Sequence, residues 1–184
     1  MADELYDVVV EKDVMVAMRD GVRLATDLYF PDGAVGALPV VLIRTPYNKK
    51  AFRGDNSESR FFAGQGFVVA VQDKRGRYES EGLYTVSGGD GPDGYDSVDW
   101  LAKQSWSNGK VGTYGCSYLG DVQIFQAPQR HPNLAAMIPQ ASGSSIGSAW
   151  RPANGVKEIA APDRSCRMGG GSLPVSGAAA ALSS

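Results

Sequence analysis

Histidine is the rarest chemically reactive residue in this sequence: the 184 residues contain one, His131. Cysteine is nearly as rare, with Cys116 and Cys166 alone. Two cysteines cannot build a disulfide scaffold, and neither has metal-ligand spacing around it, so we expect reduced thiols and no metal site. No stretch approaches the roughly 18 apolar residues of a membrane-spanning helix. These scarcities exclude disulfide-rich, zinc-binding and membrane-spanning proteins, and they leave little choice of a catalytic base.

Positive charge is not in excess either. Lysine and arginine number 18 against 20 aspartates and glutamates, which gives a net charge of −2 with the signs mixed along the chain. A nucleic-acid-binding protein carries a basic patch, so no nucleic-acid partner is expected. The N-terminal stretch MADELYDVVVEKD lacks the basic and apolar regions of a secretion signal. We therefore expect a cytoplasmic protein of one domain without a membrane partner, and its oligomeric state stays open.

The first half of the chain alternates strands with a helix. Two strands, residues 14–18 and 22–29, flank the turn signal RDG and predict an antiparallel hairpin. Residues 38–44, LPVVLIR, form a continuous apolar run that is typical of a strand buried on both faces. A helix capped by Ser57 and ending near Gly66 follows, and then a second buried strand at residues 67–72.

The second half continues the alternation after a polar loop of some twenty residues. Helices are predicted from about Tyr95 and over residues 118–127, with strands at 111–114 and 134–142. This order predicts an α/β fold: an incomplete α/β-hydrolase core with a mostly parallel sheet and an antiparallel N-terminal hairpin.

Two regions of different character divide the chain. Residues 1–153 are expected to form the N-terminal part of the hydrolase domain. Residues 154–184 are dominated by Gly, Ala, Ser and Pro without a sustained apolar period, and we expect a disordered tail there.

The stretch VGTYGCSYLG, residues 111–120, places Ser117 in a glycine-flanked turn between a strand and a helix. A nucleophilic serine sits in such an elbow because the turn exposes its hydroxyl. The backbone N–H of the next residue, Tyr118, then points at the oxyanion that forms. The usual pattern is G-x-S-x-G, whereas here the second glycine is Gly120, one place later. The competing interpretation is a serine that caps an ordinary helix.

Four other segments accompany GCSYLG: MRDGVRLATDLYFP, RTPYNK, QDKRGRYESEG and VDWLAKQSWSNGKVGTYG. Together they resemble the X-Pro dipeptidyl-peptidase and acyl esterase family over about residues 10–150. The resemblance implies a serine hydrolase that acts on small acyl esters or X-Pro peptides without a cofactor. It implies Ser117 as nucleophile, with the Tyr47 hydroxyl and the Tyr118 backbone N–H as the oxyanion site. In QDKRGRYESEG, either an ion pair between Asp73 and Arg75 holds the long loop, or the loop is solvated.

The histidine of a catalytic triad has no counterpart in this sequence. A helix of about ten residues separates His131 from Ser117 by roughly 15 Å, so we expect a surface histidine there. Asp121 lies one helical turn beyond Ser117, but a carboxylate alone is a weak base. Lys157 has no visible reason to lose its proton. We therefore expect a truncated hydrolase that is inactive alone. The alternative is a non-catalytic fragment that binds a partner or a complementing half.

Overall fold

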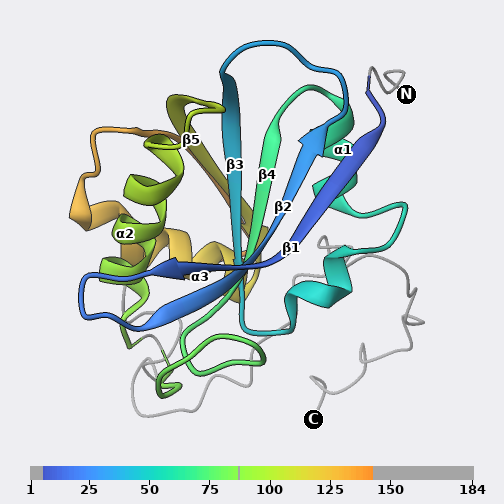
Figure 1. Ribbon diagram of the computed structural model, residues 1–184. Coiled ribbons are helices and arrows are strands. Elements are labelled where there is room, and N and C mark those ends of the chain that lie inside the picture. The colour runs from blue at the N-terminus through green and yellow to red at the C-terminus, as the bar shows by residue number, and fades with distance from the viewer. Residues whose placement is uncertain (1–5, 87, 143–184) are drawn as a thin grey trace, which may run out of the picture.

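The computed structural model describes residues 6–86 and 88–142, so the expected tail and Cys166 lie outside the described residues. One six-stranded sheet has the strand order β1-β2-β4-β3-β5-β6, and Figure 1 shows it with its helices. The elements in chain order are β1 (Val8–Ala17), β2 (Arg23–Pro31), β3 (Leu38–Thr45), η1 (Lys49–Phe52), α1 (Glu58–Gly64), β4 (Val68–Asp73), α2 (Asp90–Ala102), β5 (Ser107–Cys116), α3 (Tyr118–Gln126), η2 (Ala127–Gln129) and β6 (Leu134–Gln140).

The pairing of the strands confirms the predicted fold class. β1 pairs antiparallel with β2, and β2 antiparallel with β4. The pairs β3–β4, β3–β5 and β5–β6 are all parallel. β1 begins at Val8 rather than Val14, and a register shift between Glu11 and Val14 interrupts its pairing. The sheet is therefore mostly parallel, with the antiparallel hairpin at one edge.

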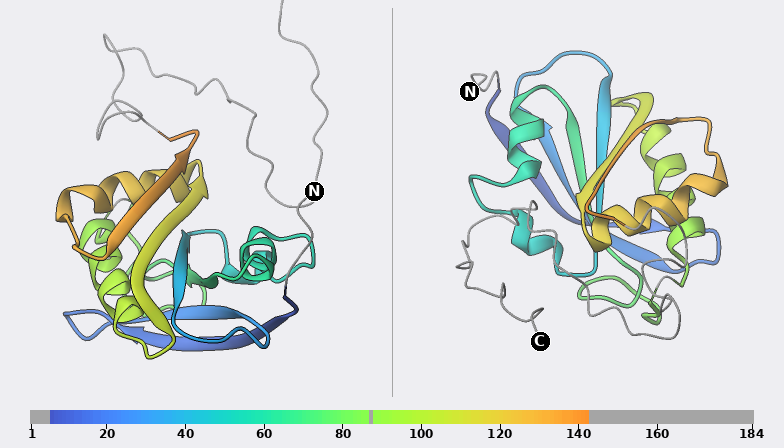
Figure 2. Two further views of the ribbon diagram at one scale, coloured as in Figure 1. Left: turned by 90° about the horizontal axis from the view of Figure 1, so that it is seen from above. Right: turned by 180° about the vertical axis from the view of Figure 1, so that it is seen from behind.

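β3 lies inside the sheet and is buried on both faces, as its apolar run predicts. Val40 and Leu42 belong to the apolar cluster that α2 covers, whereas Val41 and Ile43 belong to the cluster that α1 covers. Successive strand residues point to opposite faces, so one strand supplies both cores. Figure 2 shows α1 and α2 on opposite sides of the sheet.

α2 begins at Asp90, earlier than the expected start near Tyr95. The glycines and the proline of DGPDG suggested a loop, but proline is tolerated in the first helical turn. Tertiary contacts stabilise this turn: the Arg44 guanidinium donates to the Asp90 carbonyl at 2.7 Å. A Cβ on Gly94 would lie 2.6 Å from Gln126, so the glycine lets α2 approach α3 closely.

No helix in residues 6–86 and 88–142 is long and apolar enough to cross a membrane.

Candidate active site

Ser117 lies in the sharp turn between β5 and α3. Its backbone has φ 58° and ψ −124°, a conformation that residues other than glycine rarely adopt. Its carbonyl accepts from the N–H groups of Gly120 and Asp121 at 2.8 and 2.9 Å, and its own N–H donates to the carbonyl of Gln140 in β6 at 2.9 Å. The residue is exposed. A strained, hydrogen-bonded turn thus presents a serine hydroxyl to solvent at the carboxyl edge of the sheet.

Two glycines make this turn possible. A Cβ on Gly115 would collide with the Cβ of Leu119, and a Cβ on Gly120 would lie 2.8 Å from the Gln140 carbonyl oxygen. Gly115 therefore allows α3 to fold back over the end of β5, and Gly120 allows its first turn to lie against β6. The second glycine is needed one place later than in the usual pattern because position 120 is the one that meets β6.

Tyr47 follows β3 and is 45% exposed. Its N–H donates to the Thr45 hydroxyl at 3.0 Å. Two residues further on, the Lys49 N–H donates to the Asp73 carboxylate at 2.8 Å, which ties the segment to the end of β4. These two bonds fix the main chain on either side of the tyrosine.

The structure brings the Tyr47 side chain to Ser117, and the two side chains hydrogen-bond. Burial raises the pKa of the Tyr47 phenol, and so does the proximity of Tyr84, Tyr118 and Asp121, while the bond to Ser117 acts the other way. A raised pKa keeps the phenol protonated at neutral pH, so it is available as a hydrogen-bond donor beside the serine.

A buried lysine, for which no role was predicted from the sequence, lies next to the turn. Lys74 Nζ donates to the Asp90 carboxylate at 2.9 Å and to the Tyr118 hydroxyl at 2.6 Å. It also lies 4.4 Å from the centre of the Tyr118 ring and 5.2 Å from that of Tyr84. Burial lowers the pKa of Lys74. The lysine links the ends of β4, α2 and α3, and its position directly after a buried strand was the available sequence signal.

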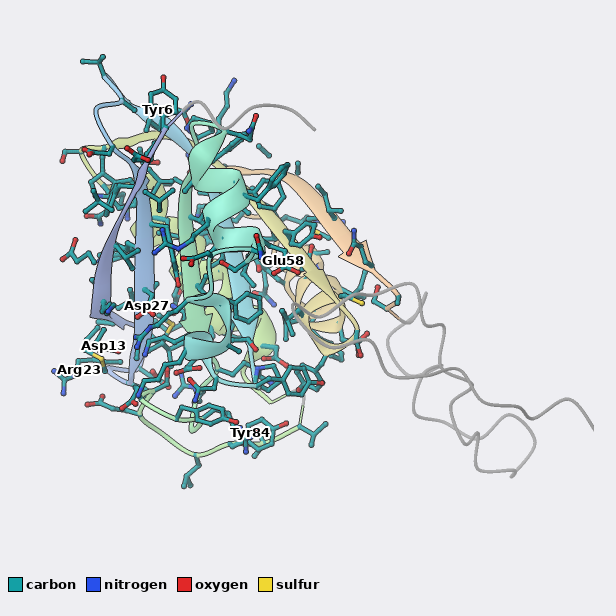
Figure 3. All side chains as sticks on the ribbon, turned by 90° about the vertical axis from the view of Figure 1, so that its right-hand side faces the viewer. Tyr6, Asp13, Arg23, Asp27, Glu58 and Tyr84 are labelled. Carbon is teal, nitrogen blue, oxygen red and sulfur yellow. The ribbon has the colours of Figure 1, made fainter. Side chains whose placement is uncertain are left out.

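A second buried lysine supports the tyrosine segment. Lys49 is completely buried, with Nζ 3.7 Å from both Asp27 and Asp73 and a hydrogen bond to Asp13. Figure 3 shows Asp13 and Asp27 close together on the N-terminal hairpin. Burial raises the pKa of Asp73. The cluster joins η1 to the hairpin and to β4.

Of the two alternatives for the long loop, the ion pair between Asp73 and Arg75 is wrong. Arg75 instead hydrogen-bonds Asp93 at 2.6 and 3.0 Å and Asp20 at 2.8 Å. β4 ends at Asp73, so Arg75 lies in the loop beyond the strand and meets different partners from those of Asp73. The loop is nevertheless held, because these ion pairs attach it to α2 and to the β1–β2 turn.

His131 is buried rather than on the surface, which corrects the expectation. Its ring packs edge-on against Tyr95 with centroids 4.3 Å apart, and its Nε2 lies 3.6 Å from Asp99. Its Nδ1 accepts from the Asn133 N–H at 3.1 Å. Helix α3 begins after Ser117 and is followed by η2, so the two residues lie at opposite ends of this helical segment. In the described part of the chain, then, no histidine accompanies the serine.

Cys116 is disulfide-bonded, so the prediction of a reduced thiol is wrong for this residue. Within residues 6–86 and 88–142 no group of three or more His, Cys, Asp or Glu side chains is placed to hold a metal ion.

The mostly parallel sheet and the serine at its strand-to-helix turn define an α/β-hydrolase fold. The model of the family described as X-Pro dipeptidyl-peptidase (S15 family) matches residues 20–164, and the chain belongs to this family of serine hydrolases, which includes esterases and X-Pro peptidases.

Three relatives illustrate the match. Cocaine esterase of Rhodococcus sp. (strain MB1 Bresler) is 40% identical over 149 residues, covering 79% of this chain and 25% of that protein. A solved α-amino acid ester hydrolase has 33% identity and a TM-score of 0.67, over 78% of this chain and 26% of its own. A CocE/NonD family hydrolase from Staphylococcus aureus has 31% identity and a TM-score of 0.67, over 73% and 28%. The chain therefore spans about a quarter of the length of these relatives.

Proposed function

We propose that this chain carries the nucleophile and the oxyanion site of a serine hydrolase acting on small acyl esters, or alternatively on X-Pro peptides. The observation that carries the proposal is the hydrogen bond between exposed Ser117, held in its strained turn, and a Tyr47 phenol that keeps its proton. The names of the relatives, an esterase and an ester hydrolase, favour esters over peptides.

In the proposed reaction the Ser117 Oγ attacks the ester carbonyl carbon while its proton passes to a general base. The carbonyl oxygen becomes an oxyanion that accepts from the Tyr47 hydroxyl and from the backbone N–H of Tyr118 at the start of α3. The alcohol leaves with the proton, and water then releases the acid from the serine. Among the described residues no histidine lies beside Ser117, and the neighbouring Asp121 is a weak base without one, so we propose little turnover by this chain alone.

A fluorophosphonate that modifies activated serines tests this assignment. We expect mass spectrometry to locate slow modification at Ser117, abolished in Ser117→Ala and slowed in Tyr47→Phe by about 100-fold or more, the typical loss of one oxyanion donor. Ser107→Ala, which changes a serine at the far end of β5, is the matched control and should react like the parent. Modification that persists in Ser117→Ala, or that is unaffected by Tyr47→Phe, would contradict the proposal.

A second candidate is a non-catalytic role in binding a complementing chain. β6 ends the strand order and pairs with β5 alone among the described residues. All of its residues are partly or fully exposed, with Ile138 at 49%. Such an edge offers unpaired backbone groups to a further strand. Sedimentation at several concentrations tests this role: a monomer throughout, with cooperative unfolding, counts against it.

A further inference from the structure

Arg77 differs from most arginines in the described residues because it has no carboxylate partner there. Six of the eight arginines in this part of the chain form salt bridges, namely Arg19, Arg23, Arg44, Arg53, Arg60 and Arg75. Arg77 and Arg130 are the other two. A guanidinium presents five N–H donors in a planar fork that matches a carboxylate. Within the described ranges, then, no carboxylate neutralises the charge of Arg77.

The Arg77 side chain is nevertheless held in place. Its Nε donates to the carbonyl of Pro46 at 3.0 Å. Its guanidinium carbon lies 5.1 Å from the centre of the Tyr78 ring and 5.0 Å from that of Tyr84, within the range of cation–π contacts. A surface arginine without such contacts loses side-chain freedom when it binds a ligand, and this loss weakens binding. Arg77 has already lost much of that freedom in the folded protein, so its entropic cost of binding is smaller.

The main chain that carries Arg77 is equally constrained. The Arg77 N–H donates to the Lys74 carbonyl at 3.0 Å, and the Ser80 N–H donates to the Arg77 carbonyl at 3.0 Å. Tyr78 has φ 48°, an uncommon conformation for a tyrosine, although its side chain is 52% exposed. A Cβ on Gly76 would collide with the backbone nitrogen of Tyr84, so the loop is folded closely on itself. Backbone strain around an exposed aromatic residue is typical of binding sites.

Two of the three side-chain contacts of Arg77, those with Pro46 and Tyr84, connect it to the serine turn. Pro46 precedes Tyr47, whose side chain hydrogen-bonds Ser117. Tyr84 hydrogen-bonds Tyr118, the residue after the serine. Figure 3 shows Tyr84 at the end of the molecule where the loops after the parallel strands gather. Arg77 thus contacts Pro46, which is the chain neighbour of Tyr47, and Tyr84, which hydrogen-bonds Tyr118. Tyr47 and Tyr118 are the two residues of the proposed oxyanion site.

We propose that Arg77 binds a carboxylate carried by the ester substrate, so that the preferred substrates are monoesters of dicarboxylic acids or other esters bearing an acid group. This inference rests on the proposed function, because it assumes that Ser117 is the reacting residue. The guanidinium would hold the anionic end of the molecule while the ester carbonyl lies between Ser117 and Tyr47. A neutral ester of the same size would lack this contact.

Binding measured without turnover tests the proposal. The Ser117→Ala chain is titrated with monomethyl succinate and with dimethyl succinate at low ionic strength, and affinities are read from ¹⁵N chemical shifts. We expect the monoanion to bind about tenfold more tightly than the neutral diester. Arg77→Met should remove that preference, Arg77→Lys should keep part of it, and the matched control Arg130→Met should keep all of it.

Several results would overturn the proposal: equal affinity for the two esters, a preference that survives in Arg77→Met, or binding of neither ester. Inorganic phosphate that binds Arg77 as tightly as the monoester would also overturn it, because the site would then accept any anion. Failure here is distinguishable from failure of the proposed function, since fluorophosphonate modification of Ser117 does not require a carboxylate.

Discussion

Replacing Lys49 by methionine should destabilise the protein by about 3 kcal/mol. Removing one partner of a buried ion pair costs about 3–5 kcal/mol. The lower end applies because the remaining carboxylates keep some partners. Asp27 retains Arg53 at 2.7 Å, and Asp73 retains the backbone N–H of residue 49 at 2.8 Å. Asp13 has a half-exposed side chain and is solvated by water instead.

Urea unfolding followed by circular dichroism measures this loss. At about 3–4 °C per kcal/mol for a domain of this size, the thermal midpoint should fall by about 10 °C. Lys103→Met is the matched control: Lys103 pairs with Asp99, but its side chain is 71% exposed, so its loss should cost below about 0.5 kcal/mol. Lys49→Met combined with Asp73→Asn should recover part of the stability. A loss equal to that of Lys103→Met would refute the reasoning.

Three other predictions concern the serine turn and pH. Ser117→Gly should raise the free energy of unfolding, measured in urea, by about 1 kcal/mol, because glycine relieves the strain. The control Ser107→Gly should lower this free energy, and equal changes in the two variants would contradict the reasoning. Gly120→Ala should cost about 2 kcal/mol and slow fluorophosphonate modification, since its Cβ would lie 2.8 Å from a β6 carbonyl; unchanged modification would count against the tight turn. Hydrogen bonds from a lysine and an arginine hold the pKa values of Glu79 and Glu81 below 4.5. The stability they confer is present above pH 4.5 and is lost as pH falls toward their folded-state pKa values, so a urea midpoint at pH 3.5 as high as at pH 6 would exclude this contribution.

The strands of the parallel sheet were predictable because their signal is local. LPVVLIR and FVVAVQ are continuous apolar runs, and a strand buried on both faces needs such a run. The start of α2 was not predictable, because glycine and proline oppose a helix locally. Arg44, from a distant strand, stabilises that turn. The burial of His131 was missed for the same reason, since Tyr95 and Asp99 lie far from it in sequence.

The partners of the charged residues were the least predictable part of the candidate site. Asp73 and Arg75 are two residues apart, but each pairs with residues far along the chain. The ammonium of Lys74 is buried beneath the serine turn, where Asp90 and Tyr118 satisfy it. A sequence shows which side chains carry charge, but it does not show which opposite charges the fold brings within hydrogen-bonding distance.

The sequence by itself determined the strand, the turn and the helix around Ser117, because Gly115 and Gly120 leave room for a turn in which a Cβ would collide with its neighbours. Only the tertiary structure decided that Tyr47 meets this serine. β3 and β5 pair in parallel, with Leu42 opposite Thr113, so both strands end at the same edge of the sheet. The residues that follow them are therefore neighbours in space, although no local preference of either segment specifies the other.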